Sequence, residues 1–386
     1  MPEQLSAHFL HTLSQNIKTW GQELGFDDVG ITDTNLDGYR EKLQQWLAKG
    51  YHGDMNWMAD HGTMRHTPED LVPNTVRVIS VRLNYLALNS DHIKTLKTPN
   101  KAYIARYALG RDYHKLMRKR LATLTQKINT AALEAGLTPP SQRGFVDSAP
   151  VLERPLAEKA GLGWIGKNTL VIHKEAGSWF FLGEVFTSLP LITDDIQSED
   201  HCGTCTACLK VCPTDAFPEP YTLDATRCIS YLTIENKGAI PVEFREPMGN
   251  RVFGCDDCQA ICPWNKYAHT TTEPDFNARH HLNNIELLDL FLWDEATFLT
   301  RTEGSPLRRI GYRGWQRNLA VGLGNAPNDI RIIEALKAKY TSADTMVQEH
   351  IAWAIQQQEK QQSPHFRRKR KIKNTAKKSI TNHNAF

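Results

Sequence analysis

The spacing of apolar residues along the first 195 positions predicts a mixture of helices and strands. Residues 6–24 carry apolar side chains at helical intervals, namely Phe9, Leu10, Leu13, Ile17 and Trp20. Apolar and other positions alternate over residues 76–85, which predicts a strand with one face formed by Ile79, Val81, Leu83 and Tyr85. A second amphipathic helix is predicted over residues 116–135. Residues 169–173 and 179–186, separated by the turn sequence EAGS, are predicted to form a two-stranded hairpin. These elements predict an α/β domain over residues 1–195 whose core can enclose a ligand.

Residues 304–358 show a helical pattern in three successive segments, which predicts short antiparallel helices of the HEAT type. Arginines recur here at four-residue intervals with aromatic residues between them: Arg308, Arg309, Tyr312, Arg313, Trp315 and Arg317. Because arginine pairs with phosphate and aromatic rings stack on unpaired bases, the pattern predicts an RNA-binding surface. The alternative is a solvated helix face with the tryptophan in the core.

Composition and charge place this chain among globular proteins and distinguish its C-terminal end. Of its 386 residues 40% are hydrophobic and 23% are charged, which is typical of folded domains. The chain has no apolar stretch of about 20 residues and no secretory signal at its start, so a cytoplasmic protein without membrane contact is expected. Residues 364–386 hold eight Lys or Arg and no acidic residue, whereas the preceding residues hold 38 basic and 43 acidic side chains. This tail indicates either a polyanionic partner or a solvated extension that aids solubility.

All eight cysteines lie between Cys202 and Cys262, which argues against a disulfide scaffold and for metal ligation. Cys202, Cys205, Cys208 and Cys212 form a C-x2-C-x2-C-x3-C-P run, and Cys255, Cys258 and Cys262 repeat its second half. In bacterial ferredoxins such a run holds [4Fe–4S] clusters, and its fourth cysteine ligates the other cluster. One cluster is therefore predicted on Cys202, Cys205, Cys208 and Cys262. The other is predicted on Cys212, Cys228, Cys255 and Cys258. Two zinc sites are the alternative, although zinc ribbons separate their C-x2-C pairs by longer gaps.

Two further features of the first domain have both a functional and a structural interpretation. Gly161, Gly163, Gly166 and Lys167 resemble a phosphate-binding loop, but the helical pattern precedes the glycines and the strand pattern follows them. This order is the reverse of a dinucleotide-binding fold, so a tight turn facing a ligand is the better interpretation. Asp147 ends a short extended stretch, where a carboxyl group acts either as a general acid or as a turn cap.

Several stretches together resemble the epoxyqueuosine reductase family over about residues 24–358. They are MRHTPEDLVP, ARYALGRDYH, VDSAPVLERPLAEKAGLGWIGKNTL, RCISYLTIE, GNRVFGCDDCQAICPWN, GSPLRRIGYRGWQRN and the cysteine runs. The resemblance implies an enzyme that reduces epoxyqueuosine to queuosine at the wobble position of tRNAs for Tyr, His, Asn and Asp. It also implies cobalamin, reduced through the two clusters by an external one-electron donor such as a flavodoxin or ferredoxin, and a monomeric protein.

The same resemblance assigns roles to individual positions. Asp147 matches the family's proton donor, and the positions that match contacts of the corrin are Arg65, Ala105, Asp147, Val171, Leu182, Ser230 and Asp256. Ala105 stands where relatives have cysteine, so a side-chain role is not expected there. Two alternatives are a reductive dehalogenase-like corrinoid enzyme and a non-catalytic double-cluster electron carrier.

The resulting fold class is α+β with several domains. We expect an α/β cobalamin and substrate domain at residues 1–195 and a ferredoxin-like double-cluster domain at 196–275. A HEAT-like helical tRNA-binding region is expected at 276–362, followed by a basic disordered tail at 363–386.

Overall fold

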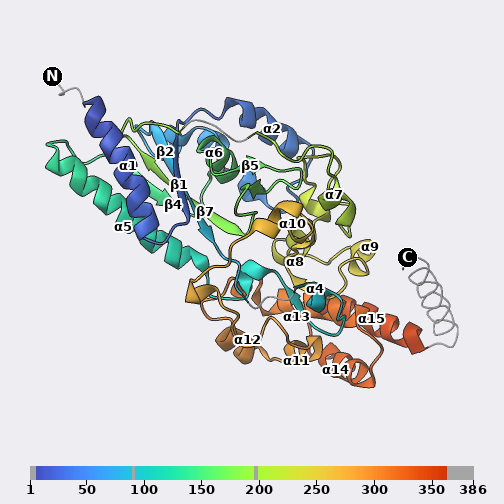
Figure 1. Cartoon of the computed structure of the whole chain (residues 1–386). Helices are drawn as coiled ribbons and strands as arrows, with labels where there is room; N and C mark the ends of the chain where they lie inside the picture. The colour runs from blue at the N-terminus through green and yellow to red at the C-terminus, as the bar shows by residue number, and fades with distance from the viewer. Residues whose placement is uncertain (1–5, 89–91, 195–198, 363–386) are drawn as a thin grey trace, which may run out of the picture. The chain divides into compact units, whose positions relative to one another are not determined.

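The computed structural model of this chain describes residues 6–88, 92–194 and 199–362 (Figure 1). It divides into two compact units, each built from three separated stretches of sequence. The first unit comprises Met1–Ser90, Arg106–Cys228 and Asp256–Ala278, and the second comprises Asp91–Ala105, Ile229–Cys255 and Arg279–Phe386. The predicted tail at 363–386 lies outside the described residues.

The first unit contains a four-stranded antiparallel sheet in the order β1-β2-β7-β4. Its strands are β1 (Asp28–Thr32), β2 (Arg77–Asn84), β4 (Gln142–Phe145) and β7 (Phe180–Thr187). A separate two-stranded sheet pairs β5 (Trp164–Ile165) with β6 (Val171–Ile172). The helices of this unit are α1 (Ala7–Glu23), α2 (Asp37–Ala48), α3 (Pro68–Leu71), α5 (Tyr113–Glu134), α6 (Glu153–Lys159), α7 (Ala207–Val211) and α10 (Asp257–Ala260).

Helices cover both faces of the main sheet. Helices α1 and α5 pack on one face, and α6 packs on the other (Figure 1). The predicted apolar face of β2 is confirmed, because Ile79, Val81, Leu83 and Tyr85 all lie in the core beneath α1 and α5. The opposite face is mixed: Val78 and Phe186 are apolar, whereas Ser80 and Glu184 are polar and fully buried. This polar pair in a strand core is the feature of the sheet that calls for a functional explanation.

The helix predictions for this unit are confirmed with small changes at their ends. Helix α1 begins after Ser6, whose side chain caps it by accepting the backbone N–H of Phe9. Helix α5 begins at Tyr113 because Asp112 caps it in the same way.

The predicted hairpin is wrong in its strand pairing. Strand β6 pairs with β5, whereas β7 pairs with β2 and β4 in the main sheet. Only an isolated bridge between His173 and Gly177 closes the EAGS turn. The physical reason is that nearly every residue of β7 is buried, so this strand takes an interior place in the larger sheet.

The second unit is mainly helical. Its helices are α4 (His92–Leu96), α8 (Ile229–Ile234), α9 (Val242–Arg245), α11 (Leu287–Phe291), α12 (Glu295–Arg301), α13 (Gly311–Asn325), α14 (Ile330–Tyr340) and α15 (Thr345–Gln362). Two short strands, β3 (Tyr103–Ile104) and β8 (Arg251–Phe253), pair in parallel. Helix α13 packs closely on α15, where a Cβ atom on Gly324 would lie 2.4 Å from the Trp353 ring. The helical character predicted for residues 304–358 is therefore confirmed.

Among the described residues, the structure has no helix with the length and apolar character needed to cross a lipid bilayer.

Candidate metal centre and acidic cluster

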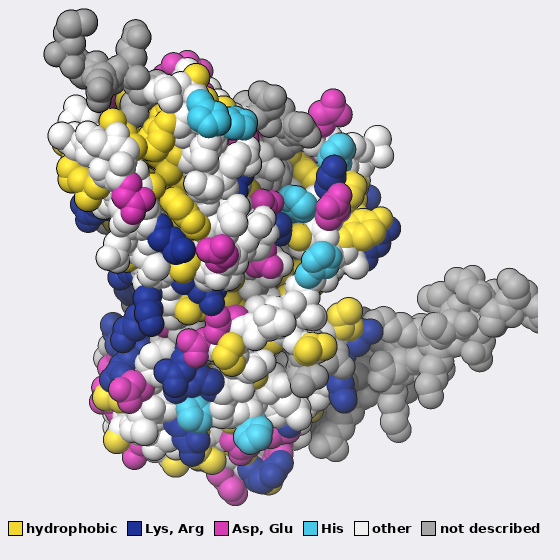
Figure 2. All heavy atoms as spheres, turned by 60° about the vertical axis from the view of Figure 1, so that its left-hand side comes forward, with side chains coloured by type: hydrophobic (Ala, Val, Ile, Leu, Met, Phe, Trp, Pro, Cys, Tyr) yellow, Lys and Arg dark blue, Asp and Glu magenta, His cyan; other side chains and the backbone are white. Residues whose placement is uncertain are grey.

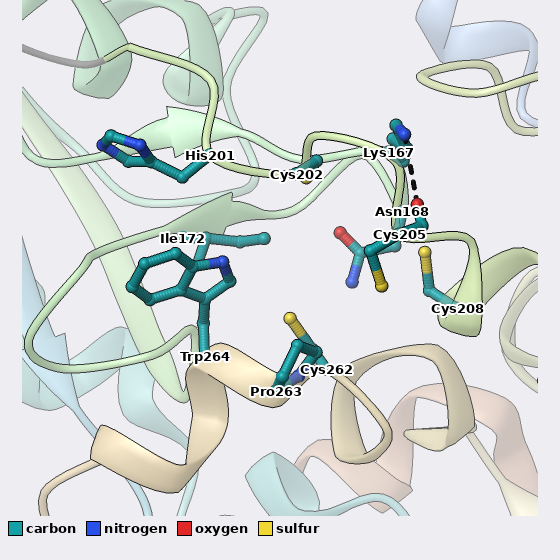
Figure 3. A pocket seen from close by; sticks show the side chains of 10 residues that line it. All are labelled: Lys167, Asn168, Ile172, His201, Cys202, Cys205, Cys208, Cys262, Pro263 and Trp264. Atoms are coloured by element: carbon teal, nitrogen blue, oxygen red, sulfur yellow. Dashed lines mark hydrogen bonds between the residues drawn. The ribbon is translucent and has the colours of Figure 1, made fainter.

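Four of the eight cysteines line one cavity in the first unit (Figure 3). They are Cys202, Cys205, Cys208 and Cys262, the same four that the spacing assigns to one cluster. The other lining residues are Lys167, Asn168, Ile172, His201, Pro263 and Trp264. Within residues 6–88, 92–194 and 199–362, no three His, Cys, Asp or Glu side chains are arranged to hold a single metal ion. A set of four thiols around a shared cavity fits a larger inorganic group such as a cubane cluster.

The glycine-rich segment supports this cysteine loop and does not form a phosphate-binding loop. The Lys167 ammonium donates hydrogen bonds to the carbonyl oxygens of Gly203 and Cys205, the latter at 3.1 Å (Figure 3). The Asn168 amide donates to the carbonyl oxygen of Cys258 at 3.2 Å. Gly163 has a φ of +144°, and a Cβ atom there would lie 2.3 Å from the carbonyl oxygen of Ile172. Glycine is therefore required for β5 and β6 to approach each other beside the cavity.

Burial and hydrogen bonding have opposite effects on the pKa of the thiols in this cavity. Burial raises the pKa of the Cys202, Cys208 and Cys262 thiols. At Cys202, a hydrogen bond from the Lys167 backbone acts in the opposite direction. Because cluster ligands are thiolates, cationic iron has to replace these protons when a cluster binds.

The other cysteines of the first unit form a second group. The Cys258 thiol lies near those of Cys228 and Cys212, and its burial raises its pKa well above the ordinary value. The Cys212 sulfur accepts the backbone N–H of Ala216 at 3.3 Å. Cys255, the remaining cysteine, is the last residue of the second unit's stretch 229–255.

Asp147 follows strand β4 and lies in a cluster of titratable side chains. Its backbone φ is +55°, a left-handed conformation that non-glycine residues rarely adopt. Its Oδ2 atom accepts the Tyr113 hydroxyl at 2.9 Å and lies 3.3 Å from His114 Nε2. The other imidazole nitrogen, Nδ1, lies 2.6 Å from Asp112. Burial opposes the charged form of His114, but the hydrogen bonds to Asp112 and Asp147 prevail and raise its pKa to about 9.

Aromatic stacking holds the Tyr113 and His114 rings in place beside Asp147. The Tyr113 ring stacks on Phe181 with 3.8 Å between centroids and on His114 with 4.2 Å. Tyr113 and His114 are the first two residues of α5, so the capped helix end presents both to Asp147. A carboxyl group held between a phenol and an imidazolium is suited to proton transfer.

Comparison with known proteins identifies the family. Residues 201–265 match the model described as "4Fe-4S double cluster binding domain", and residues 65–148 match "Epoxyqueuosine reductase QueG, DUF1730". The epoxyqueuosine reductase of Pseudomonas aeruginosa is 59% identical over 343 residues, which cover 89% of this chain and 94% of that relative. That of Escherichia coli is 56% identical, with 90% of each chain covered. The chain belongs to the epoxyqueuosine reductase family.

Solved structures agree with this assignment. The epoxyqueuosine reductase of Bacillus subtilis, solved with its catalytic aspartate loop swung out of the active site, is 27% identical with a TM-score of 0.80. The match covers 90% of this chain and 91% of that one. A crystal structure of epoxyqueuosine reductase with a tRNA-Tyr epoxyqueuosine-modified stem loop is 26% identical, with a TM-score of 0.77. It covers 91% of this chain and all of that chain.

This epoxyqueuosine reductase is therefore an oxidoreductase with two [4Fe–4S] clusters. The double-cluster match decides against the two-zinc alternative. Because the chain belongs to a family of epoxyqueuosine reductases, we set aside two other interpretations of the whole chain. These are the non-catalytic electron carrier and the dehalogenase-like enzyme.

The corrin-contacting residues predicted in the first unit have different surroundings. Arg65 is buried and donates to the carbonyl oxygens of Met58 and Trp57 at 3.1 and 2.8 Å. Val171 and Leu182 pack in one apolar cluster with Phe180. Asp256 is buried and accepts the backbone N–H of Arg106 at 2.9 Å.

The two corrin-contacting positions predicted in the second unit are Ala105 and Ser230. Ala105 is buried, and its N–H donates to the carbonyl oxygen of Phe253 at 2.8 Å. Ser230 lies partly exposed in α8. The polar contact at Ala105 is therefore made by its backbone N–H. This agrees with the expectation that its side chain has no role there.

The prediction that Arg317 contacts RNA is wrong. Arg317 is 1% exposed, and its guanidinium donates to the carbonyl oxygens of Leu232, Asn236 and Gly238 inside the second unit. Trp315 is fully buried, as the alternative interpretation stated, but Arg317 is buried beside it, so this face of α13 belongs to the core and is not solvated. Arginine spacing on a helix does not by itself distinguish an RNA-binding face from a buried hydrogen-bonding face.

The remaining arginines of the predicted RNA-binding surface are exposed. Arg308 and Arg309 precede α13 in the 3-10 helix Pro306–Ile310, so the four arginines do not lie on one continuous helix. Arg309 pairs with Glu235 at 2.9 Å and Arg313 with Asp344 at 3.0 Å. On the face shown in Figure 2, Lys and Arg side chains are interspersed with Asp and Glu and do not form an unbroken basic surface.

Sequence reasoning missed four residues of the sites. The sequence places Lys167 only in a glycine-rich segment that resembles a phosphate-binding loop, and no motif distinguishes His114 from the other histidines. Glu153 and Glu184 were not considered, although the carboxylate of Glu153 accepts the backbone N–H of Asp147 at 2.5 Å. For Glu184, an isolated acidic residue inside a strongly apolar strand is the signal that could have identified it.

Proposed function

We propose that this epoxyqueuosine reductase removes the epoxide oxygen of epoxyqueuosine in tRNA as water and so forms queuosine. In this reaction both carbon–oxygen bonds of the epoxide break and a carbon–carbon double bond forms. Two electrons reduce the two carbon atoms of the epoxide, and two protons leave with the oxygen as water. The observation that carries this proposal is the Asp147 carboxyl, which is held by Tyr113 and His114 in the unit that also contains a cavity with four cysteines.

Asp147 is the proposed proton donor to the departing oxygen. In the free enzyme the shared proton lies on His114 Nε2, because the pKa of His114 is raised to about 9. As negative charge develops on the epoxide oxygen, the proton passes from His114 Nε2 to the Asp147 carboxylate and from that carboxyl group to the oxygen. Tyr113 orients the same carboxyl through its hydroxyl.

The cysteines are the proposed cluster ligands in two sets. The first set is Cys202, Cys205, Cys208 and Cys262, supported by their common cavity. The second set is Cys212, Cys228, Cys255 and Cys258, supported by the proximity of three of its thiols and by the spacing of the fourth. Electrons are proposed to enter from a one-electron donor such as a flavodoxin or ferredoxin.

Cobalamin is the further cofactor that the family implies, and residues of the first unit fit it. Val171, Phe180 and Leu182 supply an apolar surface suited to a macrocycle. Arg65 and Asp256 are polar residues whose side chains are fixed by backbone contacts. We propose these residues and Asp147 as its contacts. When bound, cobalamin would supply a strongly reducing metal centre for the two-electron reduction.

The proposed substrate is the wobble nucleoside of tRNAs for Tyr, His, Asn and Asp, bound by a monomer. Exposed Arg308, Arg309 and Arg313 and the basic tail are proposed to contact tRNA phosphates. We further infer that the segment carrying Asp147 has a second position outside the site. The swung-out catalytic loop of the Bacillus subtilis relative supports this inference.

An anaerobic assay tests the proposed function. Reconstituted protein, cobalamin, a strong reductant and tRNA bearing epoxyqueuosine are incubated, and the nucleosides are analysed by mass. Conversion to queuosine, with loss of one oxygen atom, is expected. Complete recovery of epoxyqueuosine from protein with full iron and cobalamin content would refute the proposal.

A further inference from the structure

A buried carboxyl group in the main sheet has no assigned role in the chemistry described so far. Glu184 lies in β7, directly opposite Ser80 of β2 and Phe145 of β4, and is 0% exposed. Neither of its carboxyl oxygens has a hydrogen-bond partner of ordinary geometry among the described residues. The polar group that it faces is the carboxyl of Glu153 at the start of α6.

Glu153 links this buried group to the proposed proton donor. One of its carboxyl oxygens accepts the backbone N–H of Asp147 at 2.5 Å. Asp147 occupies the left-handed region, so its conformation persists only where surrounding contacts hold it. The contact from Glu153 acts on the backbone of Asp147, whereas Tyr113 and His114 act on its carboxyl.

Two adjacent carboxyl groups in a poorly solvated place cannot both be ionised. Desolvation, followed by the charge of Asp147, raises the pKa of Glu153 to about 7, although the Asp147 N–H opposes this. Desolvation and the charge of Glu153 raise the pKa of Glu184 well above its ordinary value. The other titratable or charged groups near Glu153 are His114, Tyr113 and Arg154. Burial therefore favours the neutral form of the Glu184 carboxyl, which faces Glu153.

We propose that Glu153 and Glu184 form a carboxyl latch, in which the buried carboxyl of Glu184 holds Glu153 and Glu153 holds the Asp147 backbone in its reactive conformation. Both are positioning residues, and this proposal rests on the proposed role of Asp147. The latch explains why an acidic residue occupies a sheet interior that is otherwise apolar on this strand. It also provides a contact that has to break when the Asp147 segment leaves the site.

Hydrogen exchange tests the latch without any turnover. The backbone N–H of Asp147 donates a hydrogen bond to Glu153. Both Glu153→Ala and Glu184→Ala should therefore accelerate amide hydrogen exchange in the segment 145–152 by on the order of 10-fold or more. Glu158→Gln is the matched control on the same helix, because Glu158 contacts Tyr39 and the backbone of Ile165. Its exchange in the segment should equal that of wild type. Unchanged protection in Glu153→Ala would overturn the latch, and this variant remains informative if Glu184→Ala fails to fold, since Glu153 is only partly buried.

Kinetics provide the second test. Glu184→Ala should lower kcat on the order of 10-fold with little change in the KM for tRNA, because the proton donor is displaced while the RNA contacts remain. Glu184→Gln, which keeps a neutral polar side chain facing Glu153, should recover most of the lost kcat. An equal loss of kcat in both variants would show that Glu184 acts only through packing, and this result would overturn the latch. If wild type itself produces no queuosine, the proposed function fails, and the exchange experiment still decides on the latch.

Discussion

At the scale of single residues, hydrogen bonding decides which acidic groups can take part in chemistry. Asp147 is one of many aspartates in the sequence, yet in the structure it lies between a phenol and an imidazole and has a strained backbone. The phenol and the imidazole come from the start of α5, with Tyr113 lying 34 positions before Asp147 in the sequence. Local sequence therefore left a turn cap and a general acid as alternatives, and the resemblance to a family was needed to favour the second.

Asp147→Asn should keep the fold and the clusters but abolish turnover. Asparagine can still accept the Tyr113 hydroxyl, but it cannot donate an acidic proton to the leaving oxygen. Iron content, cobalamin content and queuosine formation should be measured on the same preparation. Turnover at the wild-type rate would remove Asp147 from the mechanism.

The pH dependence of turnover should reflect His114. Because a protonated imidazolium replenishes Asp147, kcat should fall as pH rises through the His114 pKa of about 9. In His114→Gln this reservoir is absent, so the alkaline fall should begin about one pH unit or more lower. Single-turnover rates from pH 6 to 10 measure both profiles. Superimposable alkaline limbs would contradict the proposed relay.

Lys167→Met should weaken retention of the first cluster. The lysine joins two carbonyl groups of the loop between Cys202 and Cys205, so its loss frees the loop that carries these ligands. Iron release to a chelator should be at least about threefold faster than in wild type, because second-shell contacts orient metal ligands. Lys174→Met, in the exposed turn before β7, is the control and should release iron at the wild-type rate. Equal release rates in all three proteins would show that the contact is dispensable.

At the scale of elements, the sequence predicts what depends on local spacing and misses what depends on pairing across the chain. Helices α1 and α5 and strand β2 follow from periodicity because each has one apolar face. The partner of β7 does not follow, because a strand buried on both faces has no polar side to indicate its neighbours. The four cysteines predicted to share one cluster do line one cavity. Three of them, Cys202, Cys205 and Cys208, lie close together in the sequence. Only Cys262 joins them from a distant stretch of the chain.

Helix α15 should make the second unit sensitive to acid through His350. This side chain is fully buried, with Nε2 accepting the Ile240 N–H at 3.0 Å and Nδ1 lying 2.7 Å from the Met346 carbonyl oxygen. Burial lowers its pKa to about 4. The unfolded chain takes up a proton near pH 6.5 and the folded chain does not, so the free energy of unfolding falls as pH drops from 6.5 towards 4. The loss approaches about 3 kcal/mol from this single group.

Urea unfolding at pH 7 and pH 5 measures this effect. His350→Gln, which does not titrate, should show a smaller difference between the two pH values than wild type. The same difference in both proteins would mean that other groups account for the acid sensitivity.

At the scale of the whole molecule, charge is distributed unevenly along the chain. Removal of residues 363–386 deletes eight positive charges and no negative ones. The affinity for tRNA should therefore fall, and the slope of log K against log salt should become shallower, because fewer counterions are released. Equilibrium binding at several salt concentrations measures both quantities. A truncated protein with wild-type affinity and slope would show that the tail does not contact tRNA.

The interleaved construction of the two units has a consequence for biosynthesis. The first unit needs residues 256–278 to be complete, and these leave the ribosome only after the second unit's stretch 229–255. Cys262, the last thiol of the cavity, emerges sixty positions after Cys202. The complete set of ligands is therefore available to iron only late in the synthesis of the chain. Neither unit can be produced intact by cutting the gene at a single point.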